Sequence, residues 1–454
     1  MNEISRLNAS ETDTIAAFAT ALGGALAVIR VSGPEAVAAG QRVWQGAAPL
    51  ASPPCRTLRL GVARNAGGVL DGEVLAVYMP GPHSFTGEDV VELHCHGGAL
   101  GARLVLLALL EAGCRHAEPG EFTKRAFLNG RLDLTQAEAV ADLIGAQSES
   151  ALHLANRQLG GLLGRRVREL DEGLADLLAE IESRLDFPEE DLDWEPTASL
   201  RAGLDRAGDA CRELLDSQTE GEILRQGIVL VLAGPPNVGK SSLLNAILGR
   251  DRAIVTEIPG TTRDTLEELA HIRGIPVRLV DTAGIREAND LIERSGIERS
   301  RASIRQAQVV LWIVDGSQPY AGQAWHPGEH TFAGPVLVVA NKCDRDACDP
   351  PAGAIPTCAL DGRGLGELFD AIERLVWQTP HHRESEVAVS ARHGRCLAAA
   401  AESLAAAEAA LDGEAWELVA AALRAAQTEL GRMTGRTADP DILDIVFSRF
   451  CIGK

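Results

Sequence analysis

Short apolar runs alternate with polar segments over the first 125 residues of the chain. The runs Leu26–Val31, Val74–Tyr78 and Val90–His94 are typical of strands, and the apolar stretch Gly97–Glu111 is typical of a helix. Turn-forming residues, such as those of Pro80–Pro82, separate these segments. The pattern predicts a compact α+β module at the N-terminus.

Helical periodicity marks two later parts of the chain. Apolar residues recur at helical spacing over residues 133–185, and helix resumes over about 197–225 after an acidic break at Asp186–Pro196. Residues 390–450 are again helical and alanine-rich, with a loop at Gly431–Asp439. Neither part is polar enough to stand alone, so each must bury an apolar face. We therefore expect the two parts to pack on each other.

Residues 227–378, between the helical parts, carry apolar strands separated by helices, as in a doubly wound sheet. The predicted fold class is an α/β domain inserted into an all-α helical domain, preceded by an N-terminal α+β domain. The boundaries that we expect are 1–128 for the N-terminal domain, 227–378 for the inserted domain, and 129–226 and 379–454 for the two parts of the helical domain.

The segment Gly234–Ser241 reads Gly-Pro-Pro-Asn-Val-Gly-Lys-Ser and directly follows the apolar strand Ile228–Leu232. This spacing matches a phosphate-binding loop, in which glycines let backbone N–H groups surround a triphosphate. Lys240 would reach the β- and γ-phosphates, and Ser241 would ligate Mg²⁺. The apolar helix that follows distinguishes the motif from a chance glycine-rich turn.

Two motifs that follow later strands indicate which nucleotide binds. Asp281–Gly284 follows an apolar strand, so its aspartate can hold Mg²⁺ through water and its glycine N–H can contact a γ-phosphate. Asn341–Asp344 follows another apolar strand, and Asp344 can accept hydrogen bonds from N1–H and N2–H₂ of guanine. Adenine lacks this pair of donors, so a carboxylate here selects GTP over ATP. The motifs together predict a P-loop GTPase domain.

The polar stretch Gly260–Asp264 has the position and composition of a switch segment. The Thr262 hydroxyl would complete the Mg²⁺ shell while the γ-phosphate is present. The position after Gly284, where many small GTPases have the glutamine that orients the attacking water, is Ile285. We expect a nearby carboxylate to replace it, and the candidates are Glu287, Asp290, Glu293 and Glu298. No arginine finger can be identified from the sequence, and Arg263 and Arg286 are no more than candidates for one.

Composition limits the classes of partner. The formal net charge of −21 argues against a protein that coats nucleic acid, but it leaves room for RNA binding through a local basic patch. For the helix-face arginines Arg157, Arg165, Arg166 and Arg168, a solvated face is an equally good explanation. Nine cysteines without a CxxC pair fit a reducing cytosol. No apolar run approaches the roughly 18 residues of a membrane span, and the N-terminus has no signal pattern. We therefore expect a cytoplasmic protein of about three domains with no membrane contact.

Cys451 lies fourth from the end of the chain, where a prenylated cysteine would lie. Gly453 and Lys454 match a prenylation signal poorly, so we reject a lipid anchor. A buried structural cysteine and a reactive thiol near a binding site both remain open interpretations.

With these pieces assembled, the chain closely resembles the family of tRNA-modification GTPases called MnmE or TrmE, essentially from end to end. The GTPase motifs alone would indicate only a superfamily, whereas blocks outside them indicate this family. Those blocks are Asp13–Ile15, Ile29–Gly33, Ser84–Val90, His96–Gly98, Pro119–Phe122, Arg125–Asn129, Leu132–Leu134, Asp186–Pro188 and the ending Phe450–Lys454.

The resemblance implies an N-terminal domain that binds a folate and mediates dimerisation. The folate would be a tetrahydrofolate derivative of the 5-formyl or 5,10-methylene type. Its matching positions are Arg30, Glu92, Arg131 and Lys454. The three cationic side chains could meet the glutamate carboxylates of the folate, and Glu92 could accept from the pterin ring. A structural ion pair is the alternative at each position.

The resemblance also implies a homodimer in which two GTPase domains meet and K⁺ bridges the phosphates in place of an arginine finger. Asn237 would ligate K⁺, and Thr256, Ile258 and Thr261 would line the loop that caps it. Glu293 matches the water-orienting acid of the family, and Glu293, Lys240 and Cys451 are the candidate catalytic residues. The expected GTP-binding positions are Asn237, Val238, Gly239, Lys240, Ser241, Ser242, Thr256, Glu257, Ile258, Pro259, Gly260, Thr261, Thr262, Asp281, Thr282, Ala283, Gly284, Asn341, Lys342, Asp344, Cys358, Ala359 and Leu360.

The implied reaction needs an FAD-binding partner, MnmG, in a heterotetramer. Together the two proteins would add a carboxymethylaminomethyl or aminomethyl-type group to C5 of the wobble uridine, position 34, of certain tRNAs. GTP hydrolysis would drive conformational change and not the carbon chemistry. The alternative function is a regulatory GTP-binding switch in ribosome assembly, and the folate positions and the Cys451–Lys454 ending argue against it.

The sequence departs from the family pattern at a few places. The family usually has a Pro-Pro-Gly-Arg-Gly-like turn where this chain has Thr20–Gly24, which puts folate or dimer contacts there in doubt. Pro235 replaces a residue that is often Arg or Ser, with little expected effect, because backbone groups bind the phosphates. The fifth GTPase motif, normally Ser-Ala, reads Cys358-Ala359, and we expect weakened support of the guanine base there.

Overall fold

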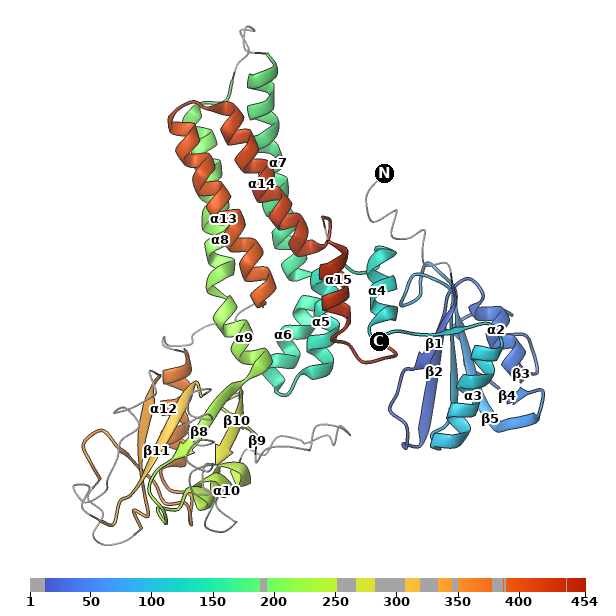
Figure 1. The fold of residues 1–454 in the computed structure, drawn as a ribbon, viewed down its shortest axis with the longest axis horizontal. Coiled ribbons are helices and arrows are strands. Elements are labelled where there is room, and N and C mark those ends of the chain that lie inside the picture. The colour runs from blue at the N-terminus through green and yellow to red at the C-terminus, as the bar shows by residue number, and fades with distance from the viewer. Residues whose placement is uncertain are drawn as a thin grey trace, which may run out of the picture. The chain divides into compact units, whose positions relative to one another are not determined.

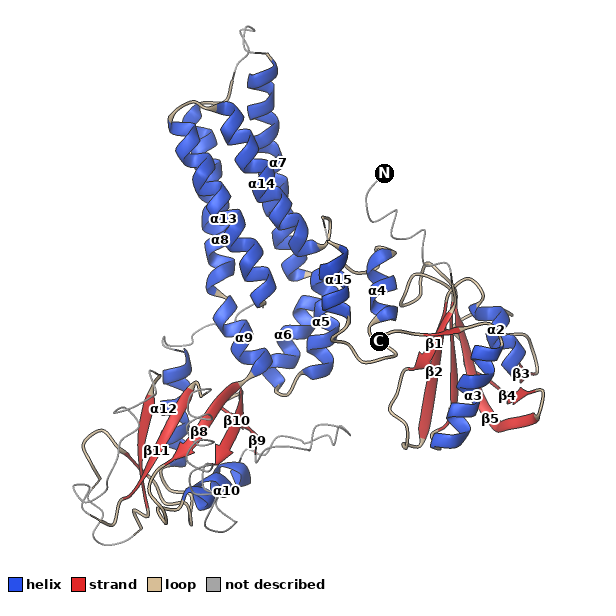
Figure 2. Cartoon of the chain, in the orientation of Figure 1, coloured by secondary structure: helices blue, strands red, loops and turns tan. Residues whose placement is uncertain are grey.

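The computed structural model describes residues 13–187, 194–250, 267–281, 307–318, 334–344, 350–377, 387, 389–437 and 439–454. The chain divides into two compact units. One unit comprises Met1–Ile144, Asn156–Leu215 and Arg392–Lys454, and the other comprises Gly145–Ala155 and Asp216–Ala391. Figures 1 and 2 show the elements of both units.

The N-terminal domain is built on a mixed sheet with the strand order β3-β4-β5-β6-β2-β1-β7. The central strands pair antiparallel, and β7 joins the edge in parallel with β1. The strands are β1 (Ile15–Phe18), β2 (Leu26–Ser32), β3 (Trp44–Gly46), β4 (Arg59–Asn65), β5 (Gly68–Met79), β6 (Val90–His96) and β7 (Arg115–His116). The predicted strands lie within β2, β5 and β6, so that part of the prediction is confirmed.

Helices α2 (Ala36–Val43) and α3 (Ala99–Glu111) pack on this sheet (Figure 1). Their apolar side chains and those of the strands form one core, in which Trp44, Ile29, Leu93 and Leu109 are fully buried. The indole N–H of Trp44 donates to the carbonyl of Val74 at 3.0 Å, so this buried polar group is satisfied. The predicted apolar helix is therefore the cover of the N-terminal sheet.

The helical domain contains segments from both sides of the insertion. From the first side come α4 (Glu121–Leu128), α5 (Leu134–Gly145), α7 (Leu162–Asp186) and α8 (Thr197–Asp216). Helix α6 (Glu149–Leu159) is divided between the two compact units, and α9 (Gln218–Gln226) belongs to the second unit. From the second side come α13 (Ala391–Asp412), α14 (Trp416–Thr434) and α15 (Pro440–Phe447). None of the described helices, including the 25-residue α7, has the length and apolar character of a membrane span.

The long helices α7, α8, α13 and α14 run side by side, as Figure 2 shows. Helix α14 packs along α7, and the amide of Gln427 donates to the carbonyl of Asp171 at 3.3 Å. The expectation that the two helical parts bury each other is confirmed. The predicted loop at Gly431–Asp439 begins too early, because α14 continues to Thr434 and ends at Gly435, whose φ of +88° suits glycine.

A buried ionic cluster lies where the chain returns from the insertion into the helical domain. Glu138 of α5 accepts from Arg392 Nε at 2.6 Å and lies 2.7 Å from His393 Nε2, in the first turn of α13. Arg392 also donates to the carbonyls of Arg432 and Met433 at the end of α14. Burial raises the pKa of Glu138, but His393 and Arg392 outweigh that effect and hold the pKa well below its usual range. The cluster therefore joins α5, α13 and α14 through one carboxylate.

The inserted domain has a sheet with the order β13-β12-β11-β8-β10-β9, parallel except for the β9–β10 hairpin. Its strands are β8 (Ile228–Ala233), β9 (Glu267–Ile272), β10 (Ile275–Asp281), β11 (Val309–Asp315), β12 (Val336–Asn341) and β13 (Ile355–Pro356). Helices α10 (Lys240–Arg250) and α12 (Leu365–Trp377) contribute to the core. The predicted doubly wound α/β domain is confirmed.

Candidate functional site

The loop between β8 and α10 has a backbone shape that requires glycine at two places. Gly234 has φ +149°, and a Cβ there would lie 2.2 Å from the carbonyl oxygen of Ile313. Gly239 has φ +93°, and a Cβ there would lie 2.3 Å from Nδ2 of Asn341. Because only glycine fits at both places, the backbone can wrap closely around an anion at the start of α10.

Lys240 and Ser241 occupy the first turn of α10, directly after this loop. The Lys240 ammonium donates to the carbonyls of Gly234 at 3.0 Å and Pro235 at 2.8 Å, so it lies over the loop. The Ser241 hydroxyl donates to Oδ2 of Asp281 at 2.8 Å. The structure thus brings together the hydroxyl and the carboxylate that the sequence predicts for Mg²⁺, with a buried lysine beside them.

Side-chain hydrogen bonds join the phosphate loop to the predicted guanine-recognition segments. Asn341 Nδ2 donates to the carbonyl of Val238 at 2.9 Å, and Asn341 Oδ1 accepts from the N–H of Ala359 at 3.1 Å. Three segments that are distant in sequence therefore meet at one asparagine. Asp344 lies three residues after Asn341, just beyond the carboxyl end of β12. On the other guanine-recognition segment, the Leu360 side chain is 86% exposed.

Lys342 forms a second link between the same segments. Its ammonium donates to the carbonyl of Asn237 at 2.6 Å and to Oδ2 of Asp315 at 2.8 Å. Burial raises the pKa of Asp315, but hydrogen bonds from Lys342 and Ser317 outweigh it and keep the pKa low. Asp315 was not among the predicted site residues, although it ends the apolar strand β11, which lies beside β8, and that position was the available signal.

Cys343 lies between Lys342 and Asp344, and its Sγ lies 3.3 Å from the carbonyl oxygen of Ala340. The described cysteines at 55, 95, 114, 211, 358, 396 and 451 have free thiols. The reducing compartment that we expect from the spacing of the cysteines stays a prediction.

Several expected site residues lie outside the part of the chain that the structure describes. They are Thr256, Glu257, Ile258, Pro259, Gly260, Thr261, Thr262, Thr282, Ala283, Gly284 and Glu293. The other candidates for the water-orienting acid, Glu287, Asp290 and Glu298, and both arginine-finger candidates also lie there. Their roles stay predictions.

The predicted folate residues of the N-terminal domain meet around two phenylalanines. Arg30 of β2 donates to Oε1 of Glu92 on β6 at 2.8 Å, and its guanidinium lies 5.3 Å and 5.7 Å from the ring centroids of Phe85 and Phe122. Burial raises the pKa of Glu92, but His94 and the Arg30 charge hold it below its usual range. The site therefore combines a cation, an ionised acceptor and aromatic surface.

The C-terminal residues dock beside Phe122. The N–H of Phe122 donates to the carbonyl of Lys454 at 3.2 Å, and Ile452 forms a β-bridge with Pro119. Gly453 has φ +98°, and a Cβ there would lie 1.8 Å from the carbonyl oxygen of Phe18. The backbone thus positions Lys454 near Arg30, while the free thiol of Cys451 is exposed. Of the two interpretations left open for Cys451, that of a buried structural cysteine is wrong, because the residue is exposed.

Arg131 approaches the same region through the loop that carries Phe85. Its Nε donates to the carbonyl of Ser84 at 3.2 Å, and a Cβ on Gly87 would lie 3.2 Å from its Cγ. The sequence analysis missed Phe85 and Phe122 as site residues. Phe85 lies in the block Ser84–Val90 and Phe122 in the block Pro119–Phe122, both of which match the family. The spacing of apolar residues does not show that their rings face Arg30.

Two family models and several curated proteins match this chain over most of its length. One family model, described as the MnmE helical domain, matches residues 134–451, and another, described as the GTP-binding protein TrmE N-terminus, matches residues 14–131. A "tRNA modification GTPase MnmE" of Chloroflexus aurantiacus is 44% identical, over 97% of this chain and 100% of that protein. One from Natranaerobius thermophilus is 42% identical, over 97% and 99%.

Among solved structures, one of Era from Aquifex aeolicus bound to GDP and AlF₄⁻ is 28% identical. It covers 33% of this chain and 56% of that chain, with a TM-score of 0.25.

Proposed function

Because this chain belongs to the MnmE family of tRNA modification GTPases, we propose that it modifies C5 of the wobble uridine, position 34, of certain tRNAs. The chain is an enzyme that hydrolyses GTP. The product would be a carboxymethylaminomethyl or aminomethyl-type group whose carbon comes from a folate, and an FAD-dependent partner, MnmG, would take part. The observation that carries the proposal is the meeting of Arg30, Glu92 and Lys454 around Phe122 in the same chain as a GTPase domain.

GTP binding would use the backbone of Gly234–Gly239 and the Lys240 ammonium for the phosphates. The Ser241 hydroxyl oxygen and Oδ2 of Asp281 lie 2.8 Å apart, and such oxygen atoms suit a hard cation such as Mg²⁺. Ser241 would bind Mg²⁺ directly, Asp281 would bind it through water, and Thr262 would be a further ligand. Mg²⁺ would neutralise charge on the β- and γ-phosphate oxygens. The guanine base would lie between Asn341–Asp344 and Cys358–Leu360, which Asn341 already connects.

We propose that K⁺ supplies the positive charge that an arginine finger gives other GTPases, and that two copies of the chain meet to form this site. Asn237 lies within the phosphate loop with φ +63°, and its carbonyl oxygen accepts a hydrogen bond from the Lys342 ammonium. This bond fixes the backbone of Asn237 within the loop. Thr256, Ile258 and Thr261 would line the capping loop. Homodimerisation has support in α3, where Leu100, Leu104 and Leu107 are 74%, 38% and 51% exposed at helical spacing.

Hydrolysis in K⁺ should exceed hydrolysis in Na⁺ at equal ionic strength by roughly 10-fold or more, because an ion of the wrong radius leaves the developing phosphate charge uncompensated. The rate per chain should also rise with protein concentration if two copies build the site. The measurement is phosphate release in KCl and in NaCl over a series of protein concentrations. Equal rates in the two salts would remove K⁺ from the mechanism.

Glu293 would orient the attacking water, because Ile285 lacks a polar side chain for that role. The Glu293→Ala variant should bind GTP as the wild type does and hydrolyse it about 100-fold more slowly. Glu287→Ala and Glu298→Ala serve as matched controls, since both carboxylates lie in the same stretch of sequence. If a control variant loses activity while Glu293→Ala keeps it, the role belongs to that other carboxylate.

The folate proposal rests on the charges around Phe85 and Phe122. The Arg30 guanidinium and the Lys454 side chain would meet carboxylates of the folate tail, with Arg131 beside them, and Glu92 would accept from pterin N–H groups. Glu92 is held ionised by Arg30 and His94, which suits an acceptor. The aromatic faces add surface for the ring. Cys451, an exposed thiol three residues from Lys454, is a candidate for the carbon chemistry.

The experiment is mass analysis of wobble uridines in cells that lack this gene and carry a plasmid copy. The wild-type copy should restore the modification, and Arg30→Ala should restore little of it while GTP hydrolysis by the purified variant stays normal. Arg64→Ala, which replaces an exposed arginine of β4 in the same domain, is the control. Wobble uridines that are unchanged in the deletion strain would contradict the tRNA proposal, and full restoration by Arg30→Ala would contradict the folate site.

These roles assign the segments of the chain. We propose 1–128 for folate binding and dimerisation, 227–378 for GTP, and 129–226 with 379–454 for transmission of the switch movements to tRNA and MnmG in a heterotetramer. The insertion suits this task, because both of its ends enter helices: α9 before β8, and α13 after the domain. We place the reaction in the cytoplasm, where a family of tRNA-modifying enzymes meets its substrate.

A further inference from the structure

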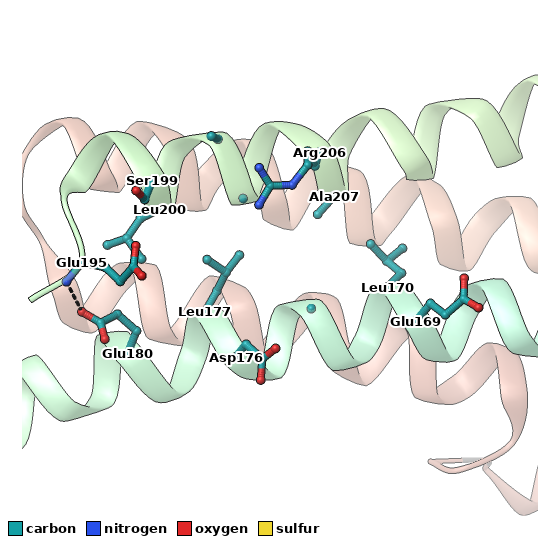
Figure 3. A pocket seen from close by; sticks show the side chains of 13 residues that line it. Glu169, Leu170, Asp176, Leu177, Glu180, Glu195, Ser199, Leu200, Arg206 and Ala207 are labelled. Carbon is teal, nitrogen blue, oxygen red and sulfur yellow. Dashed lines mark hydrogen bonds between the residues drawn. The ribbon is translucent and has the colours of Figure 1, made fainter.

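A groove of about 800 Å³ lies between α7 and α8, and none of its lining residues belongs to either site described above. Figure 3 shows Leu170 and Leu177 of α7 and Leu200 of α8 pointing into the space between the two helices, with α13 and α14 behind. Leu200 is almost completely buried, while Leu170 and Leu177 are half-buried. The groove therefore has an apolar floor that other helices support.

Small residues produce this groove. A Cβ on Gly203 of α8 would lie 2.8 Å from Cδ2 of Leu177, so the helices approach closely at the floor. On the α7 rim, a Cβ on Gly173 would have no atom within 4 Å, and on the α8 rim Ser199 and Ala202 are short and exposed. The rims thus lack the side chains that would close the space. From Glu169 to Glu180 the groove follows α7 for about three turns, or ~16 Å.

The edges of the groove are acidic. Glu169 and Asp176 are exposed along the α7 edge, and Glu195 lies at one end. One carboxylate oxygen of Glu180 already has hydrogen-bond partners within the protein, because its Oε1 accepts from Arg184 at 2.9 Å and from the N–H of Glu195 at 3.1 Å. Arg206 is the one basic residue in the lining. A ligand of this groove would therefore meet an excess of negative charge around a hydrophobic strip.

We propose that the α7–α8 groove binds one amphipathic helix of a protein partner, about three turns long, with apolar residues on one face and lysine or arginine beside them. The long, shallow shape and the apolar floor fit a helix whose side chains enter the space over Gly173. The acidic edges exclude nucleic acid by charge. Within the described residues, no group of His, Cys, Asp and Glu is arranged to hold a metal ion. The inference does not depend on the wobble-uridine proposal.

The test is fluorescence anisotropy of the full-length protein with a labelled synthetic helix of about 15 residues, built from Ala, Leu and Lys with leucines at i, i+4 and i+7. A second peptide has Glu in place of each Lys. The Lys peptide should bind with a Kd on the order of 10 µM, and the Glu peptide should bind at least about 10-fold more weakly.

Variants decide whether the groove is the binding site. Gly173→Trp and Ala202→Trp fill it from opposite rims, and each should weaken binding of the Lys peptide by about 10-fold or more. Gly173→Ala should bind as the wild type does, because the open space admits a methyl group. The Glu169→Gln/Asp176→Asn pair should weaken binding, whereas Glu172→Gln/Asp205→Asn, exposed acids of the same helices outside the lining, should not. Circular dichroism and thermal melts identify any variant that fails to fold.

Several outcomes would overturn the proposal. They are the absence of Lys-peptide binding to the wild type, equal binding of the two peptides, and binding that neither tryptophan variant weakens. Displacement of the Lys peptide by single-stranded RNA at equal affinity would indicate a nucleic-acid surface instead. A change in sedimentation coefficient between wild type and both tryptophan variants would indicate that a second copy of this chain occupies the groove.

Discussion

Replacing Asp344 by asparagine should transfer the nucleotide preference of this GTPase from GTP to XTP. The carboxylate of Asp344 accepts from N1–H and N2–H₂ of guanine in the proposed site. Asparagine offers one carbonyl oxygen and one NH₂ group instead. Xanthine has a carbonyl where guanine has its amino group, so the asparagine oxygen can accept from N1–H while its NH₂ group donates to that carbonyl. A site that recognises a base through such hydrogen bonds binds the other base much more weakly, because a polar group of the site is then buried without a hydrogen-bond partner.

We expect the ratio of kcat/KM for GTP over XTP to fall by about 10⁴-fold in Asp344→Asn. The measurement is phosphate release with each nucleotide under identical salt conditions. Asp361→Asn is the control, because Asp361 is an exposed carboxylate of the neighbouring loop that pairs with Arg363, and the substitution makes the same change in charge. A variant that keeps its preference for GTP would show that Asp344 does not contact the base.

Replacing Lys240 by alanine should reduce kcat for GTP by about 10²–10³-fold, the cost of losing one aligned donor to the developing phosphate charge. In this structure the Lys240 ammonium is held by the carbonyls of Gly234 and Pro235, so it already lies on the phosphate side of the loop. Alanine favours helix, so α10 should keep its first turn.

The measurement combines single-turnover hydrolysis with titration of a fluorescent GTP analogue, which separates binding from chemistry. Lys124→Ala is a matched control, since Lys124 lies in the N-terminal part of the chain and pairs with Asp444 at 3.6 Å. A Lys240→Ala protein that is folded, binds the analogue and hydrolyses GTP at the wild-type rate would require another cation at the phosphates.

The phosphate site shows how far local sequence determines a functional geometry. Gly234 and Gly239 belong to the eight-residue motif that connects strand β8 to helix α10. Both residues can adopt positive φ angles because glycine has no Cβ. The proximity of Ser241 to Asp281 was also predictable, because β8 and β10 pair in parallel and their carboxyl ends lie at one edge. These features depend on short-range rules that hold in any doubly wound sheet.

The links through Asn341, Lys342 and Asp315 were less accessible from the sequence. Asn341 contacts Val238 and Ala359, which lie 103 and 18 residues away along the chain. Each motif was recognisable by itself, but which side chain crosses from one loop to the next depends on the register of β11 beside β8 and of β12 beside β11. Side-chain contacts of this kind follow from packing and leave no periodic signal.

The same distinction applies to the whole chain. Apolar spacing and glycine placement determined the elements, the parallel sheet, the phosphate loop and the mutual burial of the two helical parts, because each follows from local steric preference or from the need to bury an amphipathic face. Only the tertiary structure decided that Arg30 lies over the rings of Phe85 and Phe122, that the backbone of Lys454 bonds to that of Phe122, and that Gly173 leaves a groove open. Those arrangements depend on long-range packing, in which the position of each side chain is determined by neighbours that no sequence window contains.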